Sequence, residues 1–241
     1  MQIVDSQIHI WENGRMSPQH RQIPTYSMDD ALQETAGAGV DAAVIHPPSS
    51  LGEAVNVLAV EAVRQHPDKF CILGNFDLQS PDRLNIVKNW RQRPGMLGFR
   101  FTFNQPHQQS WWTDGSLDWF WSACEQERLP VGTLPAGHMA DLGKIAERHP
   151  GLKLHIDHHG RGGGGGTGTD DAAFANLGEM LALATYPNVA VKLSGAPSYS
   201  SQPYPYRNIH QYIRQIFDAY SPQRCFWGTI SPACHARTDN A

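Results

Sequence analysis

The stretch VDSQIHIW, from Val4 to Trp11, alternates apolar and polar side chains and carries one acid, one amide and one histidine. A period of two is typical of a β-strand with one buried face, so we expect a first strand over Gln2–Ile10. Strict alternation would place Asp5, Gln7 and His9 on the same face. The fold around this strand depends on the elements that follow it.

Short apolar runs and longer amphipathic stretches alternate along the rest of the chain. Further strands are expected over Ala42–His46, Cys71–Asp77, Gly98–Phe103, Pro130–Leu134, Lys153–Asp157, Val189–Ser194 and Arg224–Gly228. Helices are expected over Met28–Ala38, Glu53–Gln65, Asp82–Arg91, Leu117–Glu127, Asp141–Arg148, Asp170–Ala184 and Asn208–Tyr220. Strands separated by single helices indicate βαβ units and a parallel sheet. The pattern predicts an α/β fold, a (β/α)8 TIM barrel lacking its last helix. A doubly wound open sheet is the alternative.

Four of the expected helices end next to a proline. The steps are His66–Pro67, Arg93–Pro94, His149–Pro150 and Tyr186–Pro187. The residue before a proline disfavours the α conformation, so these steps mark helix ends.

The composition limits the class of protein. The chain has 241 residues, 40% of them hydrophobic, which suits one barrel domain over residues 1–241. Its formal charge is −4 and its 19 Lys and Arg are scattered, so nucleic-acid binding has no support. No signal peptide and no apolar run of about 20 residues is present, so no membrane partner is expected. Cys71, Cys124, Cys225 and Cys234 form no CxxC pair, which favours reduced thiols and a cytoplasmic location. The sequence does not give the oligomeric state.

Five consecutive glycines, Gly162–Gly166, follow Arg161. The run lacks the Lys-Ser/Thr of a phosphate-binding P-loop. A flexible loop is therefore favoured, and its place after a strand leaves open a lid over the barrel mouth.

Ionisable side chains gather where strands end, which is where barrels carry their active sites. They are His9, His46, Arg100, the run Asp157–His159, and Lys192 with Ser194. We interpret His46 as a loop or substrate-binding residue and expect His155 to face the helices. Arg100 alternates with phenylalanines in GFRFTF, which points to a buried guanidinium that binds a planar anion such as a carboxylate. No G-x-S-x-G elbow and no activated thiol is evident.

The stretches VDSQIHIW, GFRFTF, HIDHHGR, VKLSG and RCFWGT together resemble the amidohydrolase superfamily, in its amidohydrolase 2 branch of TIM-barrel hydrolases. That branch includes lactonases such as 2-pyrone-4,6-dicarboxylate hydrolase. The resemblance implies that His9 and His158 are catalytic and that Arg100 holds a substrate carboxylate. It also implies the metal ligands Gln7, His9 and His158, if any metal is bound. The cofactor is then none, or one divalent metal such as zinc.

Two positions depart from the family pattern. Gln7 occupies the first place of the family's His-x-His pair, and an amide oxygen is a poor ligand for zinc. Ile230 occupies the place where the family expects an aspartate at the end of strand 8. That aspartate binds metal where there is one and takes the proton from the attacking water.

From Ile230 onward the sequence departs from the family pattern, so we expect residues 230–241 to be an aberrant tail of a C-terminally truncated chain. One inserted base, in codons that can encode this tail, restores an aspartate directly after Thr229. We therefore hypothesise a single-base deletion, either in the gene or in its sequence. The chain should then be impaired, with an uncovered strand 8 and low solubility.

The resemblance implies a hydrolase that acts on a small carboxylated lactone or cyclic ester, with water activated at the barrel mouth. A metal-free or weakly metal-bound site is favoured because of Gln7. Two alternatives stay open. One is a zinc-dependent decarboxylase of the same superfamily, and the other is a non-catalytic relative that binds small anions. The expected partner is a small carboxylated molecule.

Overall fold

The structure is a computed structural model that describes residues 1–14, 21–48, 54–160 and 168–230. Within these ranges eight strands form one sheet in the order β1-β2-β3-β4-β5-β6-β7-β8. The strands are β1 (Val4–Ile8), β2 (Ala42–Ile45), β3 (Phe70–Gly74), β4 (Met96–Phe101), β5 (Val131–Thr133), β6 (Leu154–Ile156), β7 (Val189–Ser194) and β8 (Cys225–Gly228). A doubly wound sheet would change direction partway, so the sequential order excludes it. The (β/α)8 barrel prediction is confirmed.

Helices alternate with these strands. They are α1 (Met28–Gly37), α2 (Ala54–Gln65), α3 (Arg83–Lys88), α4 (Asp118–Gln126), α5 (Met139–Arg148), α6 (Leu177–Ala182) and α7 (His210–Tyr220). The predicted helix over Asp170–Ala184 is wrong as one helix, because it divides into η5 (Asp170–Phe174), α6 and η6 (Leu183–Thr185). Asn176, a poor helix former, lies between η5 and α6, and Gly178, another, lies in the first turn of α6. All four proline steps follow the end of a helix, as predicted.

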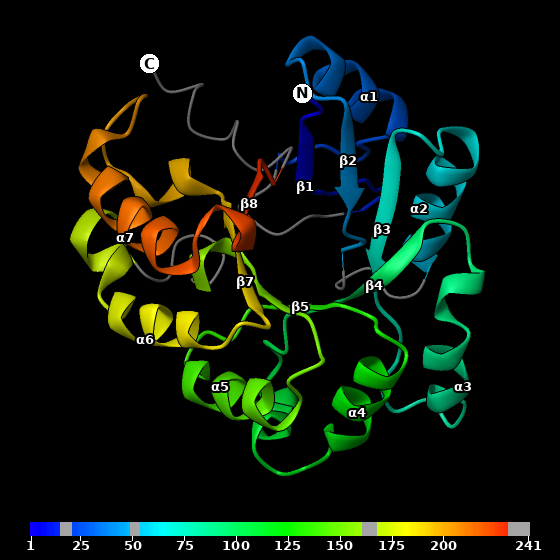
Figure 1. Ribbon diagram of the computed structural model, residues 1–241. Helices are drawn as coiled ribbons and strands as arrows, with labels where there is room; N and C mark the ends of the chain where they lie inside the picture. The colour runs from blue at the N-terminus through cyan, green and yellow to red at the C-terminus, as the bar shows by residue number, and fades with distance from the viewer. Residues whose placement is uncertain (15–20, 49–53, 161–167, 231–241) are drawn as a thin grey trace. The chain divides into compact units, whose positions relative to one another are not determined.

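The chain forms two compact units, each described by itself. Unit 1 comprises Met1–Arg100 and Trp227–Ala241, and unit 2 comprises Phe101–Phe226. In unit 1, β1, β2 and β3 run in parallel, and α1 and α2 accompany them (Figure 1). At the start of α1, Ser27 and Asp30 form a capping box, in which each side chain accepts a hydrogen bond from the backbone N–H of the other residue. Trp90 packs on Phe99 with ring centroids 4.3 Å apart, and its indole N–H donates to the Gly98 carbonyl.

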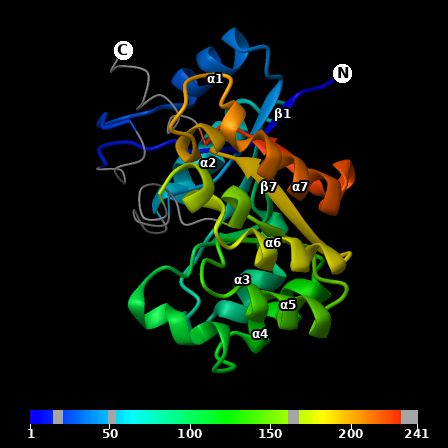
Figure 2. The same ribbon diagram turned by 90° about the vertical axis from the view of Figure 1, so that its left-hand side faces the viewer.

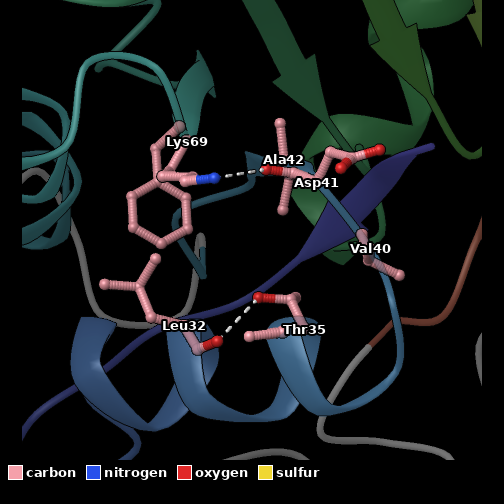
Figure 3. Close-up of a pocket in the computed structure, with 9 residues that line it drawn as sticks. Leu32, Thr35, Val40, Asp41, Ala42 and Lys69 are labelled. Atoms are coloured by element: carbon pink, nitrogen blue, oxygen red, sulfur yellow. Dashed lines mark hydrogen bonds between the residues drawn. The ribbon is translucent and has the colours of Figure 1, made fainter. Parts of the chain in front are cut away.

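A small cavity of about 50 Å³ lies between α1 and the starts of β2 and β3 (Figure 3). At the edge of the cavity, Lys69 Nζ donates to the Asp41 carbonyl. The Thr35 hydroxyl donates to the Ala31 carbonyl within α1. The cavity has room for a few water molecules, not for a lactone-sized substrate. It also lies at the amino ends of the strands, whereas barrel active sites lie at the carboxyl ends, so it is not the candidate site.

The segment after β8 is bound to β1 within unit 1. Ile230 N donates to the Gln7 carbonyl over 3.0 Å. The backbone N–H and hydroxyl of Thr229 both donate to the carboxylate of Asp5, which is 1% exposed. Asp5 is thus a structural residue that joins the first and last strands.

In unit 2, α7 packs on β7, α6 packs on α7, and α5 packs on α6 (Figure 2). Arg224, just before β8, donates to the carbonyls of Ala184, Tyr186 and Val189 and covers the ring of Tyr220. This side chain therefore fixes the end of η6 and the start of β7 to the segment that leads into β8.

Two aromatic side chains of β8, Phe226 and Trp227, are 45% and 48% exposed. The expectation that strand 8 is uncovered stays a prediction. The remainder of the predicted aberrant tail, like the polyglycine run, lies outside the described residues. Among the helices that are described, none has the length and hydropathy needed to cross a bilayer.

Candidate active site

A β-bulge interrupts the strand that carries the first candidate residues. Asp5 pairs with Ala43 and Ile8 with Ile45, so three steps along β1 match two along β2. The pairing of β1 with β2 is therefore irregular between Asp5 and Ile8, and the shared face of Asp5, Gln7 and His9 stays a prediction. The carboxylate of Asp5 accepts from Gln7 N at 2.9 Å and from Thr229, so it serves the strand junction. A bulge depends on pairing between strands, which a period-two pattern cannot reveal.

His9 follows β1 and is only 4% exposed. Its Nδ1 lies 2.6 Å from the carbonyl oxygen of His46, which directly follows β2. A carbonyl oxygen only accepts, so Nδ1 carries the proton and the neutral ring has its lone pair on Nε2. This arrangement suits a proton acceptor or a metal ligand.

His46 is fully buried and belongs to the same corner of unit 1. Its backbone N–H donates to the Ile8 carbonyl, and its ring Nε2 lies 3.1 Å from the Ser6 carbonyl. Both contacts are made to β1. The geometry thus supports a positioning role for His46, and its predicted contact with substrate stays a prediction.

Arg100 lies in β4 and is 8% exposed. Its neighbour Phe99 is fully buried against Trp90, so alternation directs Arg100 to the opposite face of the strand. The predicted burial of this guanidinium is confirmed. Its role in binding a carboxylate stays a prediction.

In unit 2 a buried ion pair joins the end of β6 to β7. Lys192 Nζ lies 3.2 Å from Asp157 Oδ1, and the two side chains are 3% and 0% exposed. His155 Nε2 lies 3.9 Å from the same carboxylate oxygen. The side chain of His155 covers the backbone of Gly132, where a Cβ would lie only 2.0 Å from its Nε2.

The expectation that His155 faces the helices is wrong. Its neighbour Ile156 approaches Met139 of α5 and Met180 of α6 around Gly160, which identifies the helix side of the sheet. Adjacent strand residues point to opposite faces, so His155 lies on the other side, with Asp157. A glycine on β5 provides the space that the histidine ring needs.

His158, the strand-6 histidine, is 5% exposed. Its Nδ1 lies 2.9 Å from the hydroxyl oxygen of Ser194 at the end of β7, and its carbonyl accepts from the Tyr199 hydroxyl at 3.3 Å. His158 and His159 both have left-handed backbones, with φ of 51° and 56°. Such conformations cluster at functional sites, where surrounding contacts hold them.

Ile230 also has a left-handed backbone, with φ of 58°. This is a true outlier for a β-branched residue, whereas aspartate and asparagine adopt it readily. The backbone at this position therefore suits an Asp or Asn better than the isoleucine it holds.

Two cysteines of unit 2 are poor nucleophiles. Burial raises the pKa of the Cys225 thiol to about 11 and raises the pKa of Cys124 well above its usual value. A thiolate is the reactive form, so neither of these two thiols is a candidate nucleophile.

The predicted site residues are described within each unit. Unit 1 brings His9 and His46 together and carries Gln7 in β1, and unit 2 holds His158 with Ser194. Among the described residues, no three His, Cys, Asp or Glu side chains form a group that could hold a metal ion. His9 has the tautomer of a ligand, whereas an amide at Gln7 fits zinc poorly.

Sequence reasoning gave no role to the ion pair of Lys192 and Asp157. A signal was available, because a lysine and an aspartate occupy the inner faces of two consecutive strands. Pairing them requires the register, in which His155 lies beside Ala190, and a single sequence does not supply it.

Comparisons with known proteins agree with this fold. A family model described as "Amidohydrolase" matches residues 4–239. An L-fucono-1,5-lactonase from Burkholderia ambifaria is 26% identical over 162 residues, which are 67% of this chain and 54% of that protein. The chain thus matches only about half the length of this curated relative.

Two solved structures are similar over nearly the whole chain. An amidohydrolase from Burkholderia multivorans with bound zinc has a TM-score of 0.82 and 20% identity, covering 97% of this chain and 86% of that one. A "probable 2-pyrone-4,6-dicarboxylic acid hydrolase" from Acinetobacter baumannii, with citric acid bound, has a TM-score of 0.69 and 18% identity. It covers 98% of this chain and 86% of that one. At these identities the likeness concerns the fold.

Proposed function

Because the chain belongs to the amidohydrolase family, we propose that it is a hydrolase of a small lactone or other cyclic ester, with carboxylated lactones as the preferred class. The observation that carries the proposal is the likeness to a protein named as a lactonase, over 162 residues. The histidines at the ends of β1 and β6 add the proton-transfer groups that ester hydrolysis needs.

The roles follow from each residue's chemistry. His9, with its lone pair on Nε2, can accept a proton from water. His158 can polarise the ester carbonyl, since it is buried and its Nδ1 faces the Ser194 hydroxyl. Arg100 has the planar fork that binds a carboxylate, which supports the carboxylated class.

A divalent metal, where bound, would activate water and polarise the carbonyl. His9 fits that use, but the amide of Gln7 does not. We therefore assign no step to a metal. The amidohydrolase structure from Burkholderia multivorans does contain zinc, so lactone hydrolysis should be measured both with and without chelator.

Position 230 tests the proposal most directly. The substitution Ile230→Asp supplies a proton acceptor in a backbone conformation that suits it, and Ile230→Asn is the matched control because it has the same shape but cannot accept a proton. We expect Ile230→Asp to hydrolyse lactones about 10²-fold or more faster than both Ile230→Asn and the unchanged chain.

The substrates are L-fucono-1,5-lactone, 2-pyrone-4,6-dicarboxylate and lactones without a carboxylate, each measured with and without chelator. Faster turnover of carboxylated lactones, lost on Arg100→Met, supports the assigned role of Arg100. Turnover of the sugar lactone alone would contradict the carboxylated class. No hydrolysis in any arm would refute the proposed function, and ligand-dependent thermal stabilisation would then favour the anion-binding alternative. Chelator-sensitive release of CO2 from aromatic acids would favour the decarboxylase.

A further inference from the structure

The short segment that starts with Asp157 and His158 is held by β7 and the turn after it at three points. Lys192 pairs with the Asp157 carboxylate, the Ser194 hydroxyl meets His158 Nδ1, and the Tyr199 hydroxyl donates to the His158 carbonyl. All five of these residues are 5% exposed or less. The ring of His158 is thus held through its Nδ1, and the backbone of His158 is held through its carbonyl.

The backbone requires these contacts. The left-handed conformation is unfavourable for residues other than glycine, and two histidines in succession adopt it before Gly160, whose φ is 72°. Contacts that fix both the ring and the carbonyl of His158 offset that cost. The segment therefore has one well-defined orientation, and the Ser194 contact determines what the ring presents on its other side.

The direction of the Ser194 hydrogen bond follows from burial. Ser194 is 0% exposed, and among the described residues its hydroxyl has one hydrogen-bonding partner, His158 Nδ1. If Nδ1–H donated to the hydroxyl oxygen, the buried hydroxyl proton would lack an acceptor among the described residues, which is unfavourable. The hydroxyl therefore donates, Nδ1 accepts, and the ring proton lies on Nε2.

We infer that Ser194 is a positioning residue that fixes neutral His158 as an Nε2–H hydrogen-bond donor, the tautomer opposite to that of His9. His9 has its proton on Nδ1, because a carbonyl oxygen faces that atom. One histidine then presents a lone pair and the other presents a donor. In the hydrolysis proposed above, on which this consequence rests, His158 Nε2–H polarises the carbonyl. The same tautomer makes Nε2 of His158 unavailable as a metal ligand without reorientation of the Ser194 hydroxyl.

The test is a two-bond ¹H–¹⁵N correlation spectrum of the full chain with ¹⁵N-labelled histidine, at a pH where the histidines are neutral. The His9→Gln and His158→Gln variants assign the two rings, since each removes one set of signals. We expect the proton of His158 on Nε2 and that of His9 on Nδ1. A His158 ring protonated on Nδ1 would overturn the inference.

Variants at Ser194 separate positioning from general packing. Ser194→Thr keeps the hydroxyl and should keep the His158 signals, whereas Ser194→Ala should shift the Nδ1 signal and mix the two tautomers. Ser122→Ala removes a hydroxyl that donates to the Asp118 carbonyl in α4, and it should leave the ring unchanged. Unchanged His158 signals in Ser194→Ala would overturn the inference.

Kinetics in the Ile230→Asp background then tests the catalytic consequence. Ser194→Ala should lower kcat about 10-fold or more with little change in KM, and Ser194→Thr should restore most of the loss. An equal kcat in Ser194→Ala and its parent would contradict the consequence for hydrolysis. The spectra do not depend on turnover, so the tautomer assignment can hold even where the proposed function fails.

Discussion

Two buried aspartates, one in each unit, have the negative charge of their carboxylates compensated in opposite ways. Asp5 is 1% exposed and accepts hydrogen bonds from neutral donors, the N–H groups of Gln7 and Thr229 and the Thr229 hydroxyl. Asp157 is 0% exposed and pairs with the ammonium group of Lys192. The donors to Asp5 are neutral and spread over several hydrogen bonds, whereas Asp157 faces the full positive charge of Lys192. The loss of one partner should therefore cost far more at Asp157 than at Asp5.

The largest effect is expected for Lys192→Met, which keeps the length of the side chain and removes its charge. The Asp157 carboxylate then remains buried without its cation, so the free energy of unfolding should fall by about 3–5 kcal/mol. Urea unfolding at neutral pH measures it. The double variant Lys192→Met/Asp157→Leu should recover most of the loss, because it removes both charges. A loss below about 1 kcal/mol for Lys192→Met would show that the pair is not the main partner of Asp157.

A smaller effect is expected for Asp5→Asn. The amide keeps one acceptor oxygen but places an NH2 group against donors, so the charge-assisted bonds to Thr229 are weakened. We expect a loss of about 2–3 kcal/mol in the free energy of unfolding, measured in the same way. A loss as large as that of Lys192→Met would remove the proposed contrast between the two aspartates.

The fold could be predicted from the sequence because its signals are local. All eight strands lie at the predicted places, and the capping box at Ser27 and the proline steps mark helix ends through the chain's own neighbours. Where prediction failed, the cause was interaction between strands. The bulge at Asp5 and the orientation of His155 depend on register and on which face meets the helices.

The candidate site was predicted less completely for the same reason. Arg100 could be recognised as buried because its own strand alternates with phenylalanines. The resemblance singled out His158, but the contact that defines its chemistry comes from Ser194, which lies 36 residues away along the chain. The ion pair of Lys192 with Asp157 also joins two strands, and it becomes visible only when they lie side by side.

A third test concerns the glycine that makes room beside Asp157. In Gly132→Ala the new Cβ would lie 2.0 Å from His155 Nε2, so the ring must move away from the carboxylate. We expect a loss of about 2 kcal/mol from overpacking. Gly178→Ala in α6 is the matched control, because its Cβ would meet nothing within 4 Å, and it should be neutral or stabilising by up to about 1 kcal/mol. Equal stability of the two variants would contradict the close packing of His155.

The smallest effect is expected for Thr229→Val, which removes one of the donors to Asp5 and keeps the shape of the side chain. The backbone N–H of Thr229 still donates to the carboxylate, so the loss should be about 1 kcal/mol. Thr229→Ser keeps the hydroxyl and should lose less. The double variant Asp5→Asn/Thr229→Val should lose less stability than the sum of the two single losses, because both variants weaken the same hydrogen bond. Full additivity would mean that the hydroxyl and the carboxylate act independently, and the junction of the first and last strands would then depend on the backbone bonds alone.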